Sequence, residues 1–305
     1  MSPEQAVEVK VGGRTLRLTN LDKVLWPEAG FTKGQMIDYY TRIAPHLLPH
    51  LKGRPLTLKR YPNGVDGEMF YEKNCPKHRP DWMQTARVWS RGNDRWMHFC
   101  VVDDLASLVW VAQLGTIEFH TSLSTKPDLE HPRMLVFDLD PGPPATIVEC
   151  CGVARRLRRW LDEHDLRSFC KTSGSKGLQL YVPLNGEAGY DVTKKISRGL
   201  ATKLEKEHPG AVVSRQTKDL RGGKVLIDWS QNDPNKTTVN VYSLRARARP
   251  TVSTPVSWEE VEACADSGDP NLLVFDAAAV LERVEKDGDL FAPLLKLHQE
   301  LPAEV

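Results

Sequence analysis

Two carboxylates one residue apart, Asp138 and Asp140, have the clearest chemical potential in this sequence. They follow an apolar run at 133–137, which is typical of a buried strand. Side chains alternate along a strand, so both carboxylates should project from one face, and Pro141 and Gly142 should end the strand. Like charges this close raise each other's pKa unless a cation neutralises them. The pair therefore predicts a divalent metal, and its hard oxygen ligands favour magnesium or manganese.

A third carboxylate, Asp228, follows another apolar run at 225–227. Three carboxylates from two strands can hold two metal ions about 3.5–4 Å apart, as in nucleotidyl transfer. Asp228 alone is also compatible with an ordinary turn at a strand end. An Asp-x-Asp pair also occurs in phosphatases of the haloacid dehalogenase type, where the first aspartate is the nucleophile. That pattern expects Thr or Val two places after the second aspartate, where this chain has Gly142, so the phosphatase is the weaker alternative.

Between the two carboxylate-bearing strands, residues 172–177 read Thr-Ser-Gly-Ser-Lys-Gly. Glycines let backbone amides converge on an anion, Ser173 and Ser175 add hydroxyl donors, and Lys176 adds a positive charge. The spacing is not that of a Walker A loop, and such a turn by itself is more often a plain hairpin. Its place between the two strands favours a loop that binds a triphosphate.

The composition indicates a globular chain whose charges are segregated along the sequence. The 305 residues are 40% hydrophobic and 27% charged, with a formal net charge of +1. Residues 1–60 hold ten Lys/Arg and five Asp/Glu, residues 194–249 hold thirteen and five, and residues 250–305 hold three and twelve. Two basic blocks favour a polyanion such as nucleic acid as partner, although charges dispersed over solvated faces would give the same counts.

The N-terminus lacks the apolar region of a signal peptide, and no run approaches the ~20 apolar residues of a membrane span. We therefore expect a cytoplasmic protein without membrane contact. The six cysteines show no small-framework spacing, and most of them sit inside apolar runs and are expected to stay reduced. Cys75 and His78 offer half of a zinc site, but no partner pair follows at suitable spacing.

Strand and helix patterns mix without strict alternation, which favours an α+β architecture. Strands are predicted at 55–61, 116–120, 133–140, 168–171, 178–183 and 224–229, and a hairpin at 7–18. Helices are predicted at 32–51, 103–113, 146–161 and 191–208, and near 257–265, 275–286 and 290–299. We treat residues 1–305 as one catalytic domain with sub-modules 1–130 and 131–305, and the best boundary lies at 127–131.

Taken in order, these motifs resemble the polymerase domain of bacterial ligase D, in the archaeo-eukaryotic primase superfamily. The resemblance rests on residues 137–142, 172–178 and 227–232, with shorter matches at 22–25, 53–55, 59–66, 242–245 and 250–252. It implies a primase-polymerase fold, with mixed or antiparallel central sheets flanked by helices. Within it, an N-terminal module that binds DNA and the 5′-phosphate would accompany an RRM-like catalytic module.

The resemblance also implies an activity and its partners. It predicts a template-directed nucleotidyltransferase that extends the 3′-hydroxyl at short gaps or breaks in DNA repair by end joining. Two manganese or magnesium ions and a nucleoside triphosphate, with ribonucleotides preferred, would serve the reaction. No Lys-x-Asp-Gly ligase motif occurs, so we expect a stand-alone, nucleoid-associated monomer that works with a separate DNA ligase and an end-binding protein. The alternative is a non-catalytic DNA-end binder with a degenerate metal site.

The resemblance assigns roles residue by residue. The metal ligands would be Asp138, Asp140 and Asp228. The nucleotide-binding residues would be His120, Ser173, Ser175, Lys176, Gly177, Gln179 and Arg245. The 5′-phosphate would be bound by Lys23, Lys33 and Lys59, and bases would stack on Phe70 and Tyr71. Gln179 departs from the family pattern, which has histidine there; glutamine still hydrogen-bonds a phosphate but carries no proton charge.

Overall fold

The computed structural model describes residues 6–90, 92 and 94–303 and divides into two compact units. Unit 1 comprises residues 1–127, 239–252 and 276–288, and unit 2 comprises 128–238, 253–275 and 289–305. The first break falls within the predicted boundary at 127–131. The later part of the chain contributes two segments to unit 1, whereas the sequence-based sub-modules were continuous.

Unit 2 is built on the order strand-helix-strand-strand-helix-strand. Its elements are β10 (Met134–Pro141), α3 (Ile147–Asp162), β11 (Phe169–Thr172), β12 (Leu178–Pro183), α4 (Tyr190–Glu207) and β14 (Val225–Asp228). The four strands are antiparallel in the spatial order β14-β10-β12-β11. This is the split βαβ arrangement of RRM-like domains. Two short strands, β13 (Val212–Val213) and β16 (Pro255–Val256), extend the sheet at its edges.

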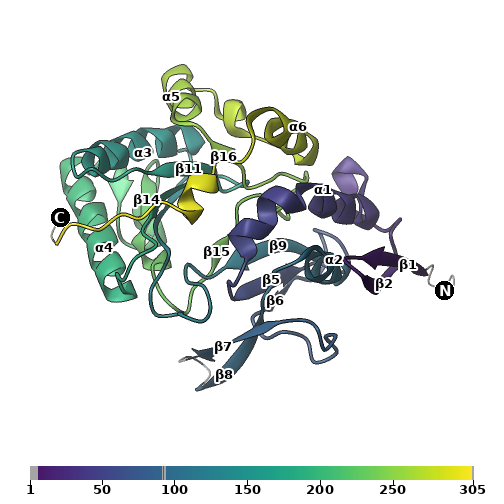
Figure 1. Cartoon of the computed structure of the whole chain (residues 1–305). Helices are drawn as coiled ribbons and strands as arrows, with labels where there is room; N and C mark the ends of the chain where they lie inside the picture. The colour runs from purple at the N-terminus through teal and green to yellow at the C-terminus, as the bar shows by residue number, and fades with distance from the viewer. Residues whose placement is uncertain (1–5, 91, 93, 304–305) are drawn as a thin grey trace. The chain divides into compact units, whose positions relative to one another are not determined.

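α3 and α4 pack on one face of this sheet because each presents an apolar stripe (Figure 1). α3 begins at Thr146, whose side chain and Glu149 form a capping box. Phe137 and Leu139 of β10 are fully buried in the core beneath the helices. Asp138 and Asp140 alternate with these two residues, so they lie on the opposite face.

Unit 1 contains a second antiparallel sheet. Its strands are β5 (Leu56–Arg60), β6 (Phe70–Glu72), β7 (Thr85–Ser90), β8 (Arg95–Cys100) and β9 (Thr116–Thr121). They follow the order β9-β5-β8-β7, with β6 paired to β5 and the short β15 (Thr238–Val239) at the β9 edge. The β7–β8 hairpin extends away from β5 and β9 (Figure 1).

The remaining elements of unit 1 are two helices beside the sheet, a third helix near the C-terminus and two small hairpins. These are α1 (Lys33–Leu51), α2 (Leu105–Gln113), α6 (Ala277–Asp287), β1 (Ala6–Val11) with β2 (Arg14–Thr19), and β3 (Val24–Trp26) with β4 (Phe31–Thr32). Capping boxes start α1 at Thr32 and α2 at Asp104, as the sequence predicts. The predicted α+β class with antiparallel sheets is confirmed.

One C-terminal helix prediction is wrong. α5 (Trp258–Ser267) and α6 form where expected, but the segment near 290–299 makes only a 3-10 turn at Ala292–Leu295. Phe291 supplies no side-chain cap to that turn. The Asn185 side-chain amide donates to the carbonyl oxygens of Leu294 and Leu297. Those carbonyls are therefore satisfied by a side chain instead of by a further helical turn.

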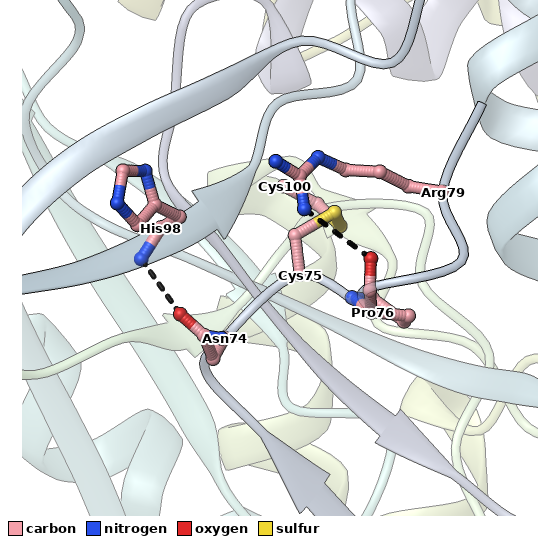
Figure 2. The surroundings of a disulfide bond; sticks show 6 residues. All are labelled: Asn74, Cys75, Pro76, Arg79, His98 and Cys100. Carbon is pink, nitrogen blue, oxygen red and sulfur yellow. Dashed lines mark hydrogen bonds between the residues drawn. A yellow bond between two sulfur atoms is a disulfide. The ribbon is translucent and has the colours of Figure 1, made fainter. Parts of the chain in front are cut away.

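Four of the six cysteines are free, as expected for most of them, and the other two are paired. Cys75 and Cys100 form a disulfide that ties the segment after β6 to the end of β8 (Figure 2). The neighbouring Asn74 side chain accepts a hydrogen bond from the His98 amide at 2.8 Å, which joins the same two segments. Cys75 is thereby unavailable as a zinc ligand. The other four cysteines are buried and free.

Candidate functional site

The three candidate metal ligands lie together on the face of the unit 2 sheet opposite α3 and α4. Asp138 on β10 pairs directly with Asp228 on β14, and Asp140 follows on the same face of β10. Directly opposed residues on antiparallel strands have Cβ atoms about 4.5–5.5 Å apart. Asp140 is exposed and Asp228 is buried. The strand register therefore brings the three carboxylates together. The sequence patterns predict the two strands but not that they pair in this way.

The charges of this carboxylate cluster repel one another. Burial raises the pKa of Asp138 above its ordinary value, and the Asp140 and Asp228 charges raise it further. The Gln179 hydrogen bond and the Lys171 charge oppose that rise. Two neighbouring carboxylates that raise the pKa of Asp138 fit a divalent cation, because the cation would remove the repulsion.

Asp228 is held by the turn that follows it. Its Oδ1 accepts hydrogen bonds from the Ser230 amide at 2.9 Å and the Ser230 hydroxyl at 2.5 Å. Its Oδ2 accepts one from the Gln231 side chain at 2.9 Å. Among the described residues no three His, Cys, Asp or Glu side chains already converge as a metal-ligand group. The cluster thus has suitable ligands, which side-chain rotation would have to bring around an ion.

The predicted phosphate loop connects β11 to β12 beside the carboxylates. Ser173 Oγ accepts hydrogen bonds from the amides of Ser175 at 3.2 Å and Gly177 at 3.1 Å. A Cβ at Gly177 would clash with the carbonyl of Leu139, the residue between the two aspartates of β10. Close backbone packing therefore requires glycine there, and it fixes the loop next to Asp138 and Asp140. Lys176 is exposed.

Gln179 does not point to the loop in this structure. Its Nε2 donates to Asp138 Oδ1 at 3.0 Å, and its Oε1 accepts from the buried Lys171 ammonium at 2.6 Å. Lys171 was not among the predicted site residues. The missed signal was the pairing of the two strands around the loop, which sets Lys171 on β11 directly opposite Gln179 on β12.

Unit 1 carries a second cluster, which we call the Glu118 cluster: Glu118, His120, Lys59 and Arg245. Glu118 Oε2 is 2.8 Å from both Lys59 Nζ and His120 Nε2, and Oε1 is 3.3 Å from Arg245 Nε. The Glu118 side chain is 2% exposed. Three residues predicted from the resemblance therefore share one buried carboxylate that sequence reasoning missed, although Glu118 faces the same side of β9 as His120.

The Glu118 cluster fixes protonation states. Burial acts to raise the pKa of Glu118, but the His120 hydrogen bond and the Arg245 and Lys59 charges hold it well below its usual range. Burial lowers the pKa of His120, and Glu118 only partly offsets this. His120 is therefore neutral at pH 7 and donates from Nε2 to Glu118, while Lys59 and Arg245 carry the compensating charge.

The two predicted stacking aromatics lie on opposite faces of β6. Tyr71 pairs with Lys59 and its ring centroid is 6.4 Å from that of His120, so Tyr71 faces the Glu118 cluster. Phe70 pairs with Arg60 on the other face. Tyr71 is 48% exposed and Phe70 is 38% exposed. Only Tyr71 shares a surface with the predicted nucleotide-binding residues of unit 1.

Two of the three predicted 5′-phosphate lysines are neighbours. The Lys33 amide donates to the Lys23 carbonyl at 2.8 Å across the β3–β4 hairpin. Lys23 is exposed and its Nζ donates to Asn63 Oδ1 at 2.8 Å, whereas Lys33 is buried and its Nζ donates to the Thr19 carbonyl. Lys59 is held by Glu118 instead. The backbones of Lys23 and Lys33 are therefore hydrogen-bonded to each other, whereas the Lys59 side chain belongs to the Glu118 cluster.

An RRM-like sheet with three clustered acids beside a glycine-rich loop defines a nucleotidyltransferase of the primase-polymerase class. Comparison with known families identifies the branch: the chain belongs to the LigD primase-polymerase domain family, whose model matches residues 32–291. The predicted resemblance is confirmed. Membership of this family rests on most of the chain and not on a single motif.

Individual relatives agree. The chain is 40% identical over 281 residues to the multifunctional non-homologous end joining protein LigD of Mycolicibacterium smegmatis, covering 92% of this chain and 36% of that protein. It is 32% identical over 288 residues to the bifunctional LigD of Bacillus subtilis, covering 94% and 45%. The chain thus spans less than half the length of these curated relatives.

A solved structure supports the fold directly. The polymerase domain of Mycobacterium tuberculosis ligase D, solved in complex with DNA, matches with a TM-score of 0.85 and 39% sequence identity. The match covers 93% of this chain and 99% of that one.

In the described part of the chain, no helix is both long and apolar enough to cross a membrane.

Proposed function

We propose that this chain adds nucleotides, directed by a template, to the 3′-hydroxyl at short gaps or breaks in DNA during end joining. The observation that carries the proposal is the register that places Asp138, Asp140 and Asp228 on one sheet face. The relatives named for non-homologous end joining, and a neighbour solved with DNA, support the substrate and the process. Resemblance favours ribonucleotides.

The three carboxylates would hold two manganese or magnesium ions, which supply charge neutralisation for attack and pyrophosphate departure. The loop at 172–177 would bind the triphosphate through Ser173, Ser175, the Gly177 amide and the Lys176 charge. In unit 1, Tyr71 offers a ring face for base stacking, and His120 and Arg245 lie in the same cluster. Glu118 orients both, so this face is preorganised before a nucleotide binds.

Lys23 and Lys33 would bind the 5′-phosphate at the gap. A terminal phosphate carries up to two negative charges, and two lysines whose backbones are hydrogen-bonded to each other would supply two positive charges. Lys59 is a third candidate for this phosphate, and its ammonium group is paired with Glu118.

We expect Lys23→Ala to weaken binding of a gapped duplex about tenfold when the 5′ end is phosphorylated, with little change when it is hydroxylated. The reason is that Lys23 is exposed and would neutralise the terminal phosphate. Fluorescence anisotropy at two salt concentrations measures this. Lys52→Ala, at an exposed lysine after α1, is the charge-matched control. The assignment is contradicted if Lys23→Ala weakens binding equally for phosphorylated and hydroxylated 5′ ends. It is also contradicted if Lys52→Ala weakens binding as much as Lys23→Ala does.

Extension of a labelled primer across a short gap tests the function itself. The assay varies the 5′-phosphate, manganese against magnesium, and ribo- against deoxynucleotides, with Asp138→Ala/Asp140→Ala as the inactive control. Templated addition that needs a divalent ion and the two aspartates supports the proposal. Tight binding of phosphorylated gaps without any addition under either metal would instead support the non-catalytic DNA-end binder.

The process implies further partners. We infer that a DNA ligase activity seals the filled gap and that an end-binding protein delivers the break, because filling alone leaves a nick. We further infer that the chain acts as a monomer in the bacterial cytoplasm, at the nucleoid, where these DNA ends occur.

A further inference from the structure

Three polar residues form a row across the centre of the unit 2 sheet. Gln179 on β12 pairs in register with Asp138 on β10 on one side and with Lys171 on β11 on the other. All three side chains project from the face opposite the helices. The row therefore starts at a buried lysine and ends at a candidate metal ligand.

The hydrogen bonds determine the orientation of the Gln179 amide. The Lys171 ammonium can only donate, and its Nζ lies 2.6 Å from Gln179 Oε1. The Tyr181 hydroxyl donates to the same oxygen at 3.1 Å. With Oε1 committed to two donors, Nε2 must face the other way, where it donates to Asp138 Oδ1 at 3.0 Å. Rotation of the amide by a half turn would place NH₂ against NH₃⁺.

Lys171 is itself held firmly. It is 1% exposed, its Nζ donates to Ser253 Oγ at 2.6 Å, and Ser253 in turn donates to the Thr172 carbonyl at 2.8 Å. Its Nζ also lies 5.6 Å from the centre of the Tyr181 ring. Burying an ammonium group costs free energy unless polar partners compensate it. Lys171 therefore has a polar role at this position, where an apolar residue would only fill space in the sheet.

We propose that Lys171 is a positioning residue that acts through Gln179: it locks the amide so that Nε2 holds Asp138 Oδ1 and directs Oδ2 to the metal. This inference rests on the proposed function, because it assumes that Asp138 binds the ion. It reassigns Gln179 from a triphosphate contact to a support of the metal ligand. Outer partners of metal ligands typically change metal affinity 10–100-fold when removed.

Manganese binding to the full chain, without DNA or nucleotide, tests the proposal. Isothermal titration or the electron paramagnetic resonance signal of free manganese gives the dissociation constant. Lys171→Met and Gln179→Leu should each weaken binding about 10–100-fold. The double variant should be no weaker than Gln179→Leu, because both act through one amide. Gln179→His should retain affinity within about threefold, since one ring nitrogen can accept from Lys171 while the other donates to Asp138.

Two controls separate the possible failures. Ser253→Ala removes another partner of Lys171 but leaves the Gln179 contact, so it should change manganese affinity less than about threefold. Asp140→Asn removes a proposed ligand; if it leaves manganese binding intact, the metal site of the proposed function fails. If Asp140→Asn weakens binding but Lys171→Met and Gln179→Leu do not, only the positioning role is overturned. Additive losses in the double variant, or a lower melting temperature with unchanged affinity, also overturn it.

Discussion

Replacement of Asp228 by asparagine is expected to reduce nucleotide addition by about 10³-fold or more while leaving the fold intact. The asparagine side chain would keep an oxygen for the Ser230 amide but would lose the charge that faces Asp138. A metal-supported transition state depends on that charge by several kcal/mol, and ~4 kcal/mol corresponds to about 10³ in rate. Single-turnover extension of a gapped primer at saturating manganese measures the loss.

Stability should move in the opposite direction from activity. The Asp228 charge helps to raise the pKa of Asp138, so its removal relieves repulsion in the metal-free protein. The melting temperature of Asp228→Asn without metal should therefore equal or exceed that of the wild type. Manganese should raise the melting temperature of the wild type by mass action and should raise that of the variant much less.

Asp233→Asn is the matched control for this prediction. Asp233 lies five residues further along the same loop, where it pairs with Lys194 at 2.8 Å. The Asp233→Asn substitution makes the same chemical change as Asp228→Asn, but in a partly exposed salt bridge. Nucleotide addition should therefore fall less than about threefold. Substantial addition by Asp228→Asn, or an equal loss in both variants, would show that the third carboxylate is not part of the chemistry.

The sequence predicts the elements that carry the unit 2 site because their signals are local. Apolar runs before Asp138 and Asp228 mark strands, and Thr146 with Glu149 marks a helix start. Alternation also predicts that Asp138 and Asp140 share a face. It does not give the register that opposes Asp138 to Asp228, because pairing depends on strand order across nearly ninety residues of chain.

The sequence predicts which face of a strand a side chain occupies better than it predicts the hydrogen-bond partners of that side chain. Gln179 reads as a phosphate contact because it follows a glycine-rich loop, yet three strands place it between Asp138 and Lys171. The β7–β8 hairpin was also missed, although 85–90 and 95–100 alternate around a turn-forming stretch. The Cys75–Cys100 pair depends on that hairpin, so its disulfide was missed with it.

The second large effect concerns the Glu118 cluster. Glu118→Gln is expected to lower the free energy of unfolding at pH 7 by about 3–5 kcal/mol, the usual cost of breaking a buried ion pair on one side. Lys59 and Arg245 are 18% and 11% exposed, so water cannot replace the lost carboxylate well. Urea unfolding followed by tryptophan fluorescence measures the change.

Glu72→Gln provides the matched control. Glu72 on β6 pairs with Arg60 on β5 at 2.7 Å, and the two side chains are 29% and 19% exposed. Its loss should cost about 1–2 kcal/mol, because the Glu72 carboxylate is far more exposed than that of Glu118 and Arg60 keeps its hydrogen bond to the Leu114 carbonyl oxygen. Equal losses in the two variants would mean that Glu118 contributes no more than an ordinary surface pair.

The pH dependence gives a second, independent test of the same cluster. The folded pKa of Glu118 lies below its usual value of 4.5, so its contribution is complete above that pH and is lost as the pH falls further. Burial lowers the pKa of His120 below 6.5, so below that pH the unfolded chain binds a proton that the folded chain refuses. Both groups make the wild type less stable toward acid. Glu118→Gln lacks the first contribution, so its deficit relative to the wild type should shrink below about pH 4.5. A deficit that stays constant from pH 7 down to about pH 3 would show that packing, not the carboxylate charge, explains the loss.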